Sequence, residues 1–126
     1  MKKVIVVSKT HLDLGFTDYA ENIKQKYIHS FIPDAIDLAE KVNTADKKYF
    51  IWTTGSWILK ETLKNPTQKA KLEKAIKDGN IVPHAMPFTT HTELLDVDSL
   101  DYGLALVDEL DKIRGRKTIS AKISPA

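Results

Sequence analysis

His11 and Asp13 are the first residues whose types and spacing could do chemistry. They stand in the stretch THLDLGF at positions 10–16, directly after a short β-branched run. Residues two apart on an extended chain point the same way and lie about 6–7 Å apart, so the imidazole and the carboxylate could converge on one cation. A mixed nitrogen and oxygen pair suits zinc or another borderline divalent ion. Spacing alone leaves an alternative open: Asp13 could cap the turn that follows, and His11 could be a polar residue at the end of a strand with no role in chemistry.

A second group of polar side chains follows the third predicted strand. His84 lies near the end of this strand, and His91 and Glu93 lie in the segment after it. Each is a candidate ligand, acid or substrate-binding group, and each could instead be a polar residue that hydrogen-bonds the backbone. His29 lies in the middle of a predicted helix and is expected to be exposed or to pack there.

The two tryptophans stand on either side of Gly55. Indole faces stack on the C–H faces of sugar rings, so a tryptophan at the end of a strand is a candidate carbohydrate platform. Trp57 follows the turn at Gly55 and is the better binding candidate. Trp52 lies within the predicted strand, and we expect it in the core.

These side chains need a framework of strands and helices to hold them. Short apolar runs predict four strands, at positions 3–8, 49–53, 81–88 and 118–123. Helical spacing predicts helices over 20–42, with a kink or restart at Pro33, and over 56–64, 65–79 and 98–113. Strands that alternate with helices predict a parallel β/α fold of the α/β class, in which functional residues lie at the carboxyl ends of the strands.

Composition excludes several classes of function. The chain has 126 residues, no cysteine and a formal net charge of +2, from 19 Lys and Arg against 17 Asp and Glu. The charge gives no field that favours nucleic acid or an anionic membrane, and the absence of cysteine excludes thiolate chemistry. The longest aliphatic run, at positions 4–7, is far shorter than a membrane span of about 20 residues. We therefore expect a soluble cytoplasmic protein.

The stretch THLDLGF resembles the metal motif H-x-D-x-G-[W/F] of the glycoside hydrolase family 38 α-mannosidases. Three longer strings, VSKTHLDLGFTDYAE, FIWTTGSW and MPFTTHTELLD, are closer to a poorly characterised bacterial branch of that superfamily. The resemblance covers nearly all of this chain but only the N-terminal part of a family member. It implies that residues 1–126 are part of the N-terminal catalytic domain of a longer protein, with about four strands of a seven-stranded, barrel-like β/α domain.

The resemblance also implies a chemistry. His11 and Asp13 would be two zinc ligands, and the reaction would be retaining hydrolysis of a mannoside or a related glycoside. In the family, an aspartate after the fourth strand is both nucleophile and metal ligand, a histidine far downstream completes the site, and a second carboxyl group is the acid/base. Trp57, His91 and Glu93 are our candidates for binding the carbohydrate.

This sequence departs from the family pattern at three places. Lys9 replaces a histidine of the better-known mannosidases, and TTHTE at positions 89–93 replaces an acidic segment, which leaves the substrate preference open. After Ser124, where the nucleophilic aspartate is expected, the chain has Pro125. We therefore expect a truncated, frameshifted or cut fragment that is inactive on its own.

Two other functions remain open at this point. One is a metal-dependent hydrolase or deacetylase that acts on C–N or phosphoester bonds, with His84 and His91 completing the site. The other is a carbohydrate-binding module that holds sugar through Trp57 without chemistry. Because an incomplete sheet leaves strand edges unpaired, we also expect a homo-oligomer or a strand-exchanged dimer.

Overall fold

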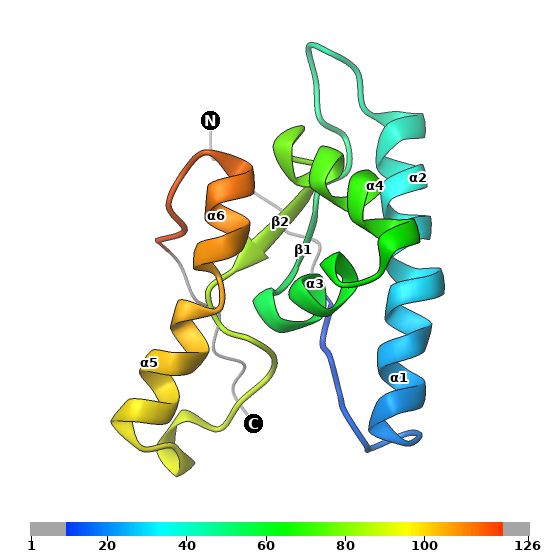
Figure 1. Cartoon of the computed structure of the whole chain (residues 1–126). Coiled ribbons are helices and arrows are strands. Elements are labelled where there is room, and N and C mark those ends of the chain that lie inside the picture. The colour runs from blue at the N-terminus through cyan, green and yellow to red at the C-terminus, as the bar shows by residue number, and fades with distance from the viewer. Residues whose placement is uncertain (1–9, 120–126) are drawn as a thin grey trace, which may run out of the picture.

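The computed structural model describes residues 10–119, and this part of the chain is mostly helical (Figure 1). The elements in chain order are α1 (Ala20–Lys26), η1 (Tyr27–Phe31), α2 (Ile32–Val42), β1 (Trp52–Gly55), α3 (Ser56–Leu63), α4 (Pro66–Lys77), β2 (Ile81–His84), η2 (Thr92–Leu94), α5 (Val97–Ala105) and α6 (Asp108–Arg114). Here η1 is a π-helical turn and η2 a 3₁₀ turn. Over positions 10–119, no helix is long and apolar enough to cross a membrane.

The prediction of about four strands is wrong. Within the described residues the sheet has two strands, β1 and β2, which pair in parallel with Trp52 opposite Ile81 and Gly55 opposite His84. Positions 118 and 119 are not in a strand, and the predicted strand at 3–8 and the rest of that at 118–123 lie outside the described residues. Over positions 10–119 the fold is mixed α/β, with helices dominating, and does not have the strands of half a barrel.

The two observed strands are also shorter than predicted, because their flanking backbone groups bond elsewhere. Before β1, the N–H groups of Tyr49 and Phe50 donate to the side chain of Asn43. After β2, the carbonyls of Met86 and Pro87 accept the first N–H groups of α3, at 3.2 Å each. Each group thus has a partner outside the ladder, and the strands end there.

The irregularity predicted at Pro33 takes the form of a π-helical turn, η1, which ends two residues before this proline. Proline has no N–H, and its ring clashes with the carbonyl four residues earlier, so a regular helix cannot run through it unchanged. The chain widens to η1 just before this point, and the N–H of Ile32 donates to the carbonyl of Tyr27. The helix then continues as α2, so α1, η1 and α2 follow one another as a long, interrupted rod (Figure 1).

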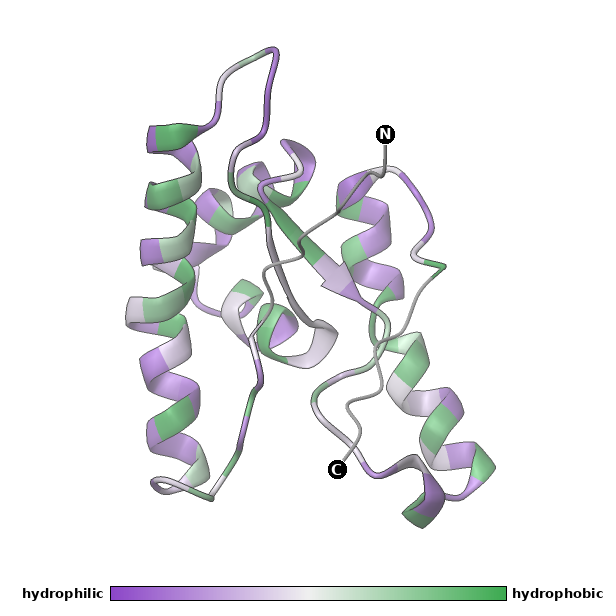
Figure 2. Cartoon of the chain, turned by 180° about the vertical axis from the view of Figure 1, so that it is seen from behind, coloured by the Kyte–Doolittle hydropathy of each residue, from purple (hydrophilic) through white to green (hydrophobic). Residues whose placement is uncertain are grey.

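The core lies between the helices and one face of the sheet. Hydrophobic and hydrophilic residues alternate along the α1–α2 rod, as expected for helices with one face on a core (Figure 2). Burying a large aliphatic side chain stabilises a fold by about 1.5–3 kcal/mol relative to leaving it exposed. The largest fully buried apolar side chains are Ile32, Ile36, Ile58, Leu59, Leu72, Ile76, Ile81 and Leu110.

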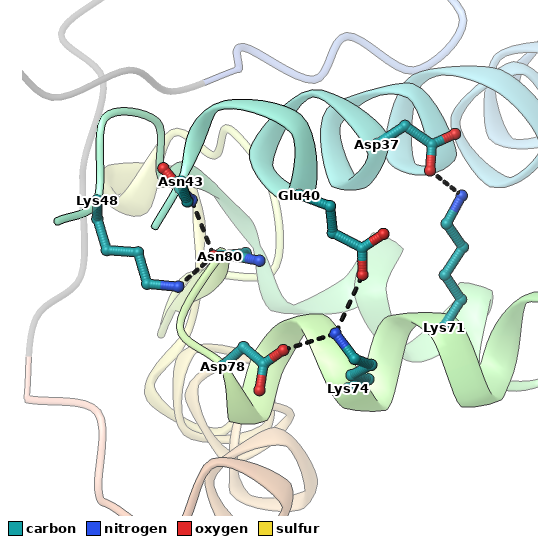
Figure 3. Close-up of polar contacts among 8 residues, drawn as sticks. All are labelled: Asp37, Glu40, Asn43, Lys48, Lys71, Lys74, Asp78 and Asn80. Atoms are coloured by element: carbon teal, nitrogen blue, oxygen red, sulfur yellow. Dashed lines mark hydrogen bonds and ion pairs between the residues drawn. The ribbon is translucent and has the colours of Figure 1, made fainter. Parts of the chain in front are cut away.

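Ion pairs join α2 to α4 along their outer edge (Figure 3). Lys71 pairs with Asp37, and Lys74 pairs with Glu40 at 3.1 Å and with Asp78 at 2.9 Å. The two carboxylates beside Lys74, Asp78 first and Glu40 second, raise the pKa of its ammonium group. These side chains are largely exposed, so the pairs orient the helices more than they stabilise them.

Asn43 closes the loop between α2 and β1. Its Oδ1 accepts the N–H groups of Tyr49 and Phe50 at 2.8 and 2.9 Å, and its Nδ2 donates to the carbonyl of Phe50 and to Oδ1 of the buried Asn80. Lys48 donates to the same oxygen of Asn80 (Figure 3). The side chain of Asn43 therefore holds the segment entering β1 against the residue that precedes β2.

Candidate metal and substrate site

The His11–Asp13 segment lies in an extended conformation next to β1. The N–H of Thr10 donates to the carbonyl of Thr53 at 3.3 Å, and the indole N–H of Trp52 donates to the hydroxyl of Thr10. Leu12 is buried in the core, at 5% exposed. Because side chains alternate along an extended chain, burying Leu12 turns His11 and Asp13 outward together.

The structure brings these two side chains into contact. Nε2 of His11 lies 2.8 Å from Oδ1 of Asp13, and the side chains are 48% and 46% exposed. On the other side of the ring, Nδ1 lies 3.3 Å from the hydroxyl of Thr89. A hydroxyl can donate or accept, so Thr89 fits either tautomer of the imidazole.

Tyr27 contacts the backbone of the His11–Asp13 segment. Its hydroxyl donates to the carbonyl of His11 at 3.5 Å, and its ring stacks on Trp52 with centroids 6.5 Å apart and planes 10° apart. Burial, and then the negative charge of Asp13, raise the pKa of the Tyr27 phenol. Since Tyr27 opens η1, the interruption of the long helix contributes directly to this site.

His11 and Asp13 fit a divalent cation as two of its ligands. Imidazole nitrogen and carboxylate oxygen are both zinc donors, and they already face one another. A histidine ligand usually makes a hydrogen bond through its other ring nitrogen, and Thr89 stands at that position. The described residues contain no group of three or more His, Cys, Asp or Glu side chains that could hold a metal, so over positions 10–119 the pair gains no third such ligand.

His84, His91 and Glu93 occupy two different environments. His84 ends β2 and is buried, at 8% exposed. His91 lies on the exposed segment that follows, with its Nδ1 3.2 Å from Oε1 of Glu93, and the pKa of this carboxyl is lowered by a backbone hydrogen bond and then by the contact with His91. Within the described part of the chain, these residues do not form a metal-binding cluster with the His11–Asp13 pair, which is what the hydrolase or deacetylase alternative requires.

Trp52 and Trp57 differ in burial. Trp52 is 8% exposed in the core, which confirms that prediction. Trp57 is only partly buried, in the first turn of α3, and its ring meets Phe88 edge to face, with centroids 6.1 Å apart. It also lines a cavity of about 440 Å³ between α3, the segment after β2, and α5.

The approach of α3 to the segment after β2 requires a glycine. The N–H of Trp57 donates to the carbonyl of Pro87 at 3.2 Å. A Cβ on Gly55 would overlap the Pro87 carbonyl oxygen and lie 2.9 Å from its carbon. The missing side chain at position 55 therefore lets α3 and residues 86–90 lie close enough to place Trp57 beside Phe88.

Sequence reasoning missed the roles of Thr89 and Tyr27. Tyr27 belongs to the apolar stripe of a predicted helix, and nothing in that pattern reveals that its hydroxyl reaches the backbone of His11. Thr89 lies in the segment after the third predicted strand, where residues at the carboxyl ends of neighbouring parallel strands come together. In the sequence, only that rule indicated that Thr89 could lie near His11.

Comparison with protein families, curated proteins and solved structures finds no match to this chain. The resemblance to family 38 therefore rests on the sequence motifs described above.

Proposed function

We propose that this chain is the metal-binding part of a divalent-metal-dependent glycoside hydrolase that acts on α-mannosides or related glycosides, with zinc or another divalent cation as its cofactor. The observation that carries the proposal is the His11–Asp13 pair, 2.8 Å apart, with Thr89 on the far side of the imidazole. The proposal uses the sequence motif and this pair, and does not depend on a barrel architecture.

In this proposal His11 and Asp13 hold the cation. With Nε2 of His11 as the ligand atom, the ring N–H is at Nδ1, where the hydroxyl oxygen of Thr89 can accept it. Leu12 in the core and the hydrogen bond from Tyr27 keep the backbone of the two ligands in place. A bound zinc ion would supply a Lewis-acidic centre for sugar hydroxyls.

Trp57, His91 and Glu93 are proposed to bind the carbohydrate. Trp57 offers an indole face beside Phe88, and His91 and Glu93 offer polar groups on an exposed segment. The resemblance puts the nucleophile at position 125, which is proline in this chain. We therefore expect this chain to bind a glycoside and not to turn it over. We also propose a cytoplasmic location, from the cysteine-free composition.

The proposal is tested by sugar binding with and without metal. Titration of the zinc-loaded chain with methyl α-mannoside, followed by protein NMR, should show binding that EDTA abolishes. His11→Ala and Asp13→Ala should abolish it as well, and Trp57→Ala should weaken it. His29→Ala is the matched control, because His29 is an exposed histidine of η1.

Two outcomes would contradict this proposal. Sugar binding that is indifferent to EDTA but lost in Trp57→Ala would replace the enzyme by a carbohydrate-binding module. Absence of binding across a broad panel of glycosides would count against the glycoside hydrolase class.

A further inference from the structure

The cavity beside Trp57 is built from three separate parts of the chain. Its volume is about 440 Å³, and it lies between α3, residues 86–90 and α5. The segment after β2 runs between the two helices (Figure 1). Its walls include the aromatic rings of Trp57, Phe88 and Tyr102 and the aliphatic side chains of Leu95, Leu100 and Leu106. This size and lining are typical of sites for small organic molecules, which occupy about 300–1,000 Å³.

The wall contributed by α5 is only partly covered by protein. Gly103 is the one buried residue of this helix, and Leu100 and Leu106 are each only half-buried. On the opposite wall, Trp57 and Phe88 are held edge to face at 88°. A flat apolar molecule between these walls would cover apolar surface that the described residues leave accessible.

The charged side chains of the lining are already paired. Lys64 forms an ion pair with Glu61, and Nζ of Lys60 lies 3.4 Å from Oε2 of Glu109. Because these side chains already have partners, a charged ligand would lose hydration against the apolar rings and aliphatic side chains without gaining an unpaired counter-charge, which costs free energy. The lining therefore favours a ligand without net charge.

We propose that this cavity is a binding site for an uncharged aromatic small molecule. Binding there needs no metal, so the inference goes beyond the proposed function. Phe88 and Thr90 line the cavity while Thr89 between them contacts His11, so the cavity and the metal pair share one short segment.

Protein NMR of the metal-free chain tests the site and the ligand class together. The probes are 2-naphthol, which is uncharged at neutral pH, and 2-naphthoate, which has a similar shape and one negative charge. We expect 2-naphthol to bind with a dissociation constant of about 0.1–1 mM, typical of a ligand with so few atoms. Its largest shifts should fall on the indole N–H of Trp57 and the amide of Gly103. The indole of Trp52, bonded to Thr10 in the core, is the internal reference.

The affinity for 2-naphthoate and the affinities of two variants for 2-naphthol complete the test. 2-Naphthoate should bind at least about 10-fold more weakly than 2-naphthol. Trp57→Ala should weaken 2-naphthol binding by about 10-fold. Its fold can be checked through the fluorescence of Trp52, the one tryptophan that remains. Tyr49→Ala, which removes an exposed aromatic ring, should leave the affinity unchanged.

Three results would overturn the inference. They are absence of 2-naphthol binding at millimolar concentration, shifts centred away from Trp57 and Gly103, and equal or tighter binding of 2-naphthoate. Because no metal or sugar is present, the outcome is independent of whether His11 and Asp13 bind zinc.

Discussion

The hydroxyl of Thr89 lies 3.3 Å from Nδ1 of His11, although the two residues are 78 positions apart in the chain. One belongs to the segment that leaves β2, and the other to the segment that lies along β1. The opposite nitrogen of the same imidazole, Nε2, faces Asp13. The ring of His11 therefore lies between Asp13 and Thr89.

Thr89 is expected to orient the imidazole of His11 so that its other nitrogen can bind the metal. Replacing Thr89 by Val removes the hydroxyl with little change of shape, so the ring nitrogen at Nδ1 loses its partner. We expect zinc affinity to fall by about 10-fold, as is common when the hydrogen-bond partner of a ligand is removed. Isothermal titration with zinc measures the change.

Two further variants make this prediction specific. Thr89→Ser keeps a hydroxyl and should keep most of the affinity. Thr90→Val removes the neighbouring hydroxyl, which donates to the carbonyl of Phe88 and not to His11, and should have no effect on zinc. Equal losses in Thr89→Val and Thr90→Val would show that Thr89 acts only through the local backbone.

Gly55 is expected to tolerate no side chain. The Cβ of Gly55→Ala would overlap the backbone carbonyl of Pro87, which cannot move without shifting residues 86–89. We expect a loss of about 2–4 kcal/mol in the free energy of unfolding, measured by urea denaturation. The control is Gly79→Ala, where there is open space but φ is +70°, and where the expected cost is about 1–2 kcal/mol from the backbone alone. A Gly55→Ala protein as stable as the wild type would refute the close approach.

Asn43 is expected to be more costly to remove than the exposed Asn22. Asn43→Ala takes away the acceptor of two backbone N–H groups and the donor to Phe50 and Asn80. Because part of this network is buried, we expect the free energy of unfolding to fall by about 2–3 kcal/mol. Asn22→Ala removes one exposed contact, with Asp18, and should cost less than about 0.5 kcal/mol. Similar costs for the two variants would contradict the role of Asn43 as a clamp.

Asp18 is expected to make the free energy of unfolding depend on pH in the acid range. Hydrogen bonds from Lys26, Asn22 and the backbone of Tyr19 lower the pKa of its carboxyl from 3.8 to about 2. A pKa depressed by folding contributes stability that is present above the unfolded value and is lost as pH falls through the folded one. The stability difference between wild type and Asp18→Asn should therefore be constant above about pH 4 and shrink between pH 4 and pH 2.

The cause of this shift can be tested separately. Lys26→Met removes the largest contribution and should raise the pKa of Asp18, as read from its carboxyl carbon in an NMR titration. Lys41→Met, on the exposed side of α2, should leave that pKa where it is. A stability difference that does not change between pH 4 and pH 2 would mean that folding does not lower the pKa of Asp18.

Local patterns predicted the helices over 20–42, 56–64 and 65–79, whereas the single helix predicted over 98–113 is two helices, α5 and α6, and the strand predicted over 49–53 shares only positions 52 and 53 with β1. Asn65 accepts the N–H groups of Thr67 and Gln68 as the cap of α4, and the spacing at Pro33 located the break in the long helix. The bounds of these two strands differ from the prediction because an apolar run does not show where its flanking backbone groups will bond. Around β1 and β2 those groups bond to Asn43 and to the start of α3, and neither contact can be read from hydrophobic periodicity.

The candidate site was predictable where it is local. The alternation of His11, Leu12 and Asp13 on an extended chain is a property of the sequence, and the structure places the two polar side chains together. The supporting contacts from Tyr27 and Thr89 are long-range, and they depend on a π-helical turn and on the path of the chain after β2. Neither has a signature in the sequence around His11.

A zinc titration of the wild type and of the His11→Ala, Asp13→Ala double variant tests directly whether these two residues bind the cation. The wild type should bind one zinc ion with a dissociation constant on the order of 10–100 µM, because two protein ligands hold a metal more weakly than four. The double variant should lose at least about 10-fold in affinity, whereas the matched His29→Ala, Asp34→Ala variant should bind as the wild type does. Tight zinc binding that survives in the His11→Ala, Asp13→Ala variant would show that His11 and Asp13 are not the metal ligands.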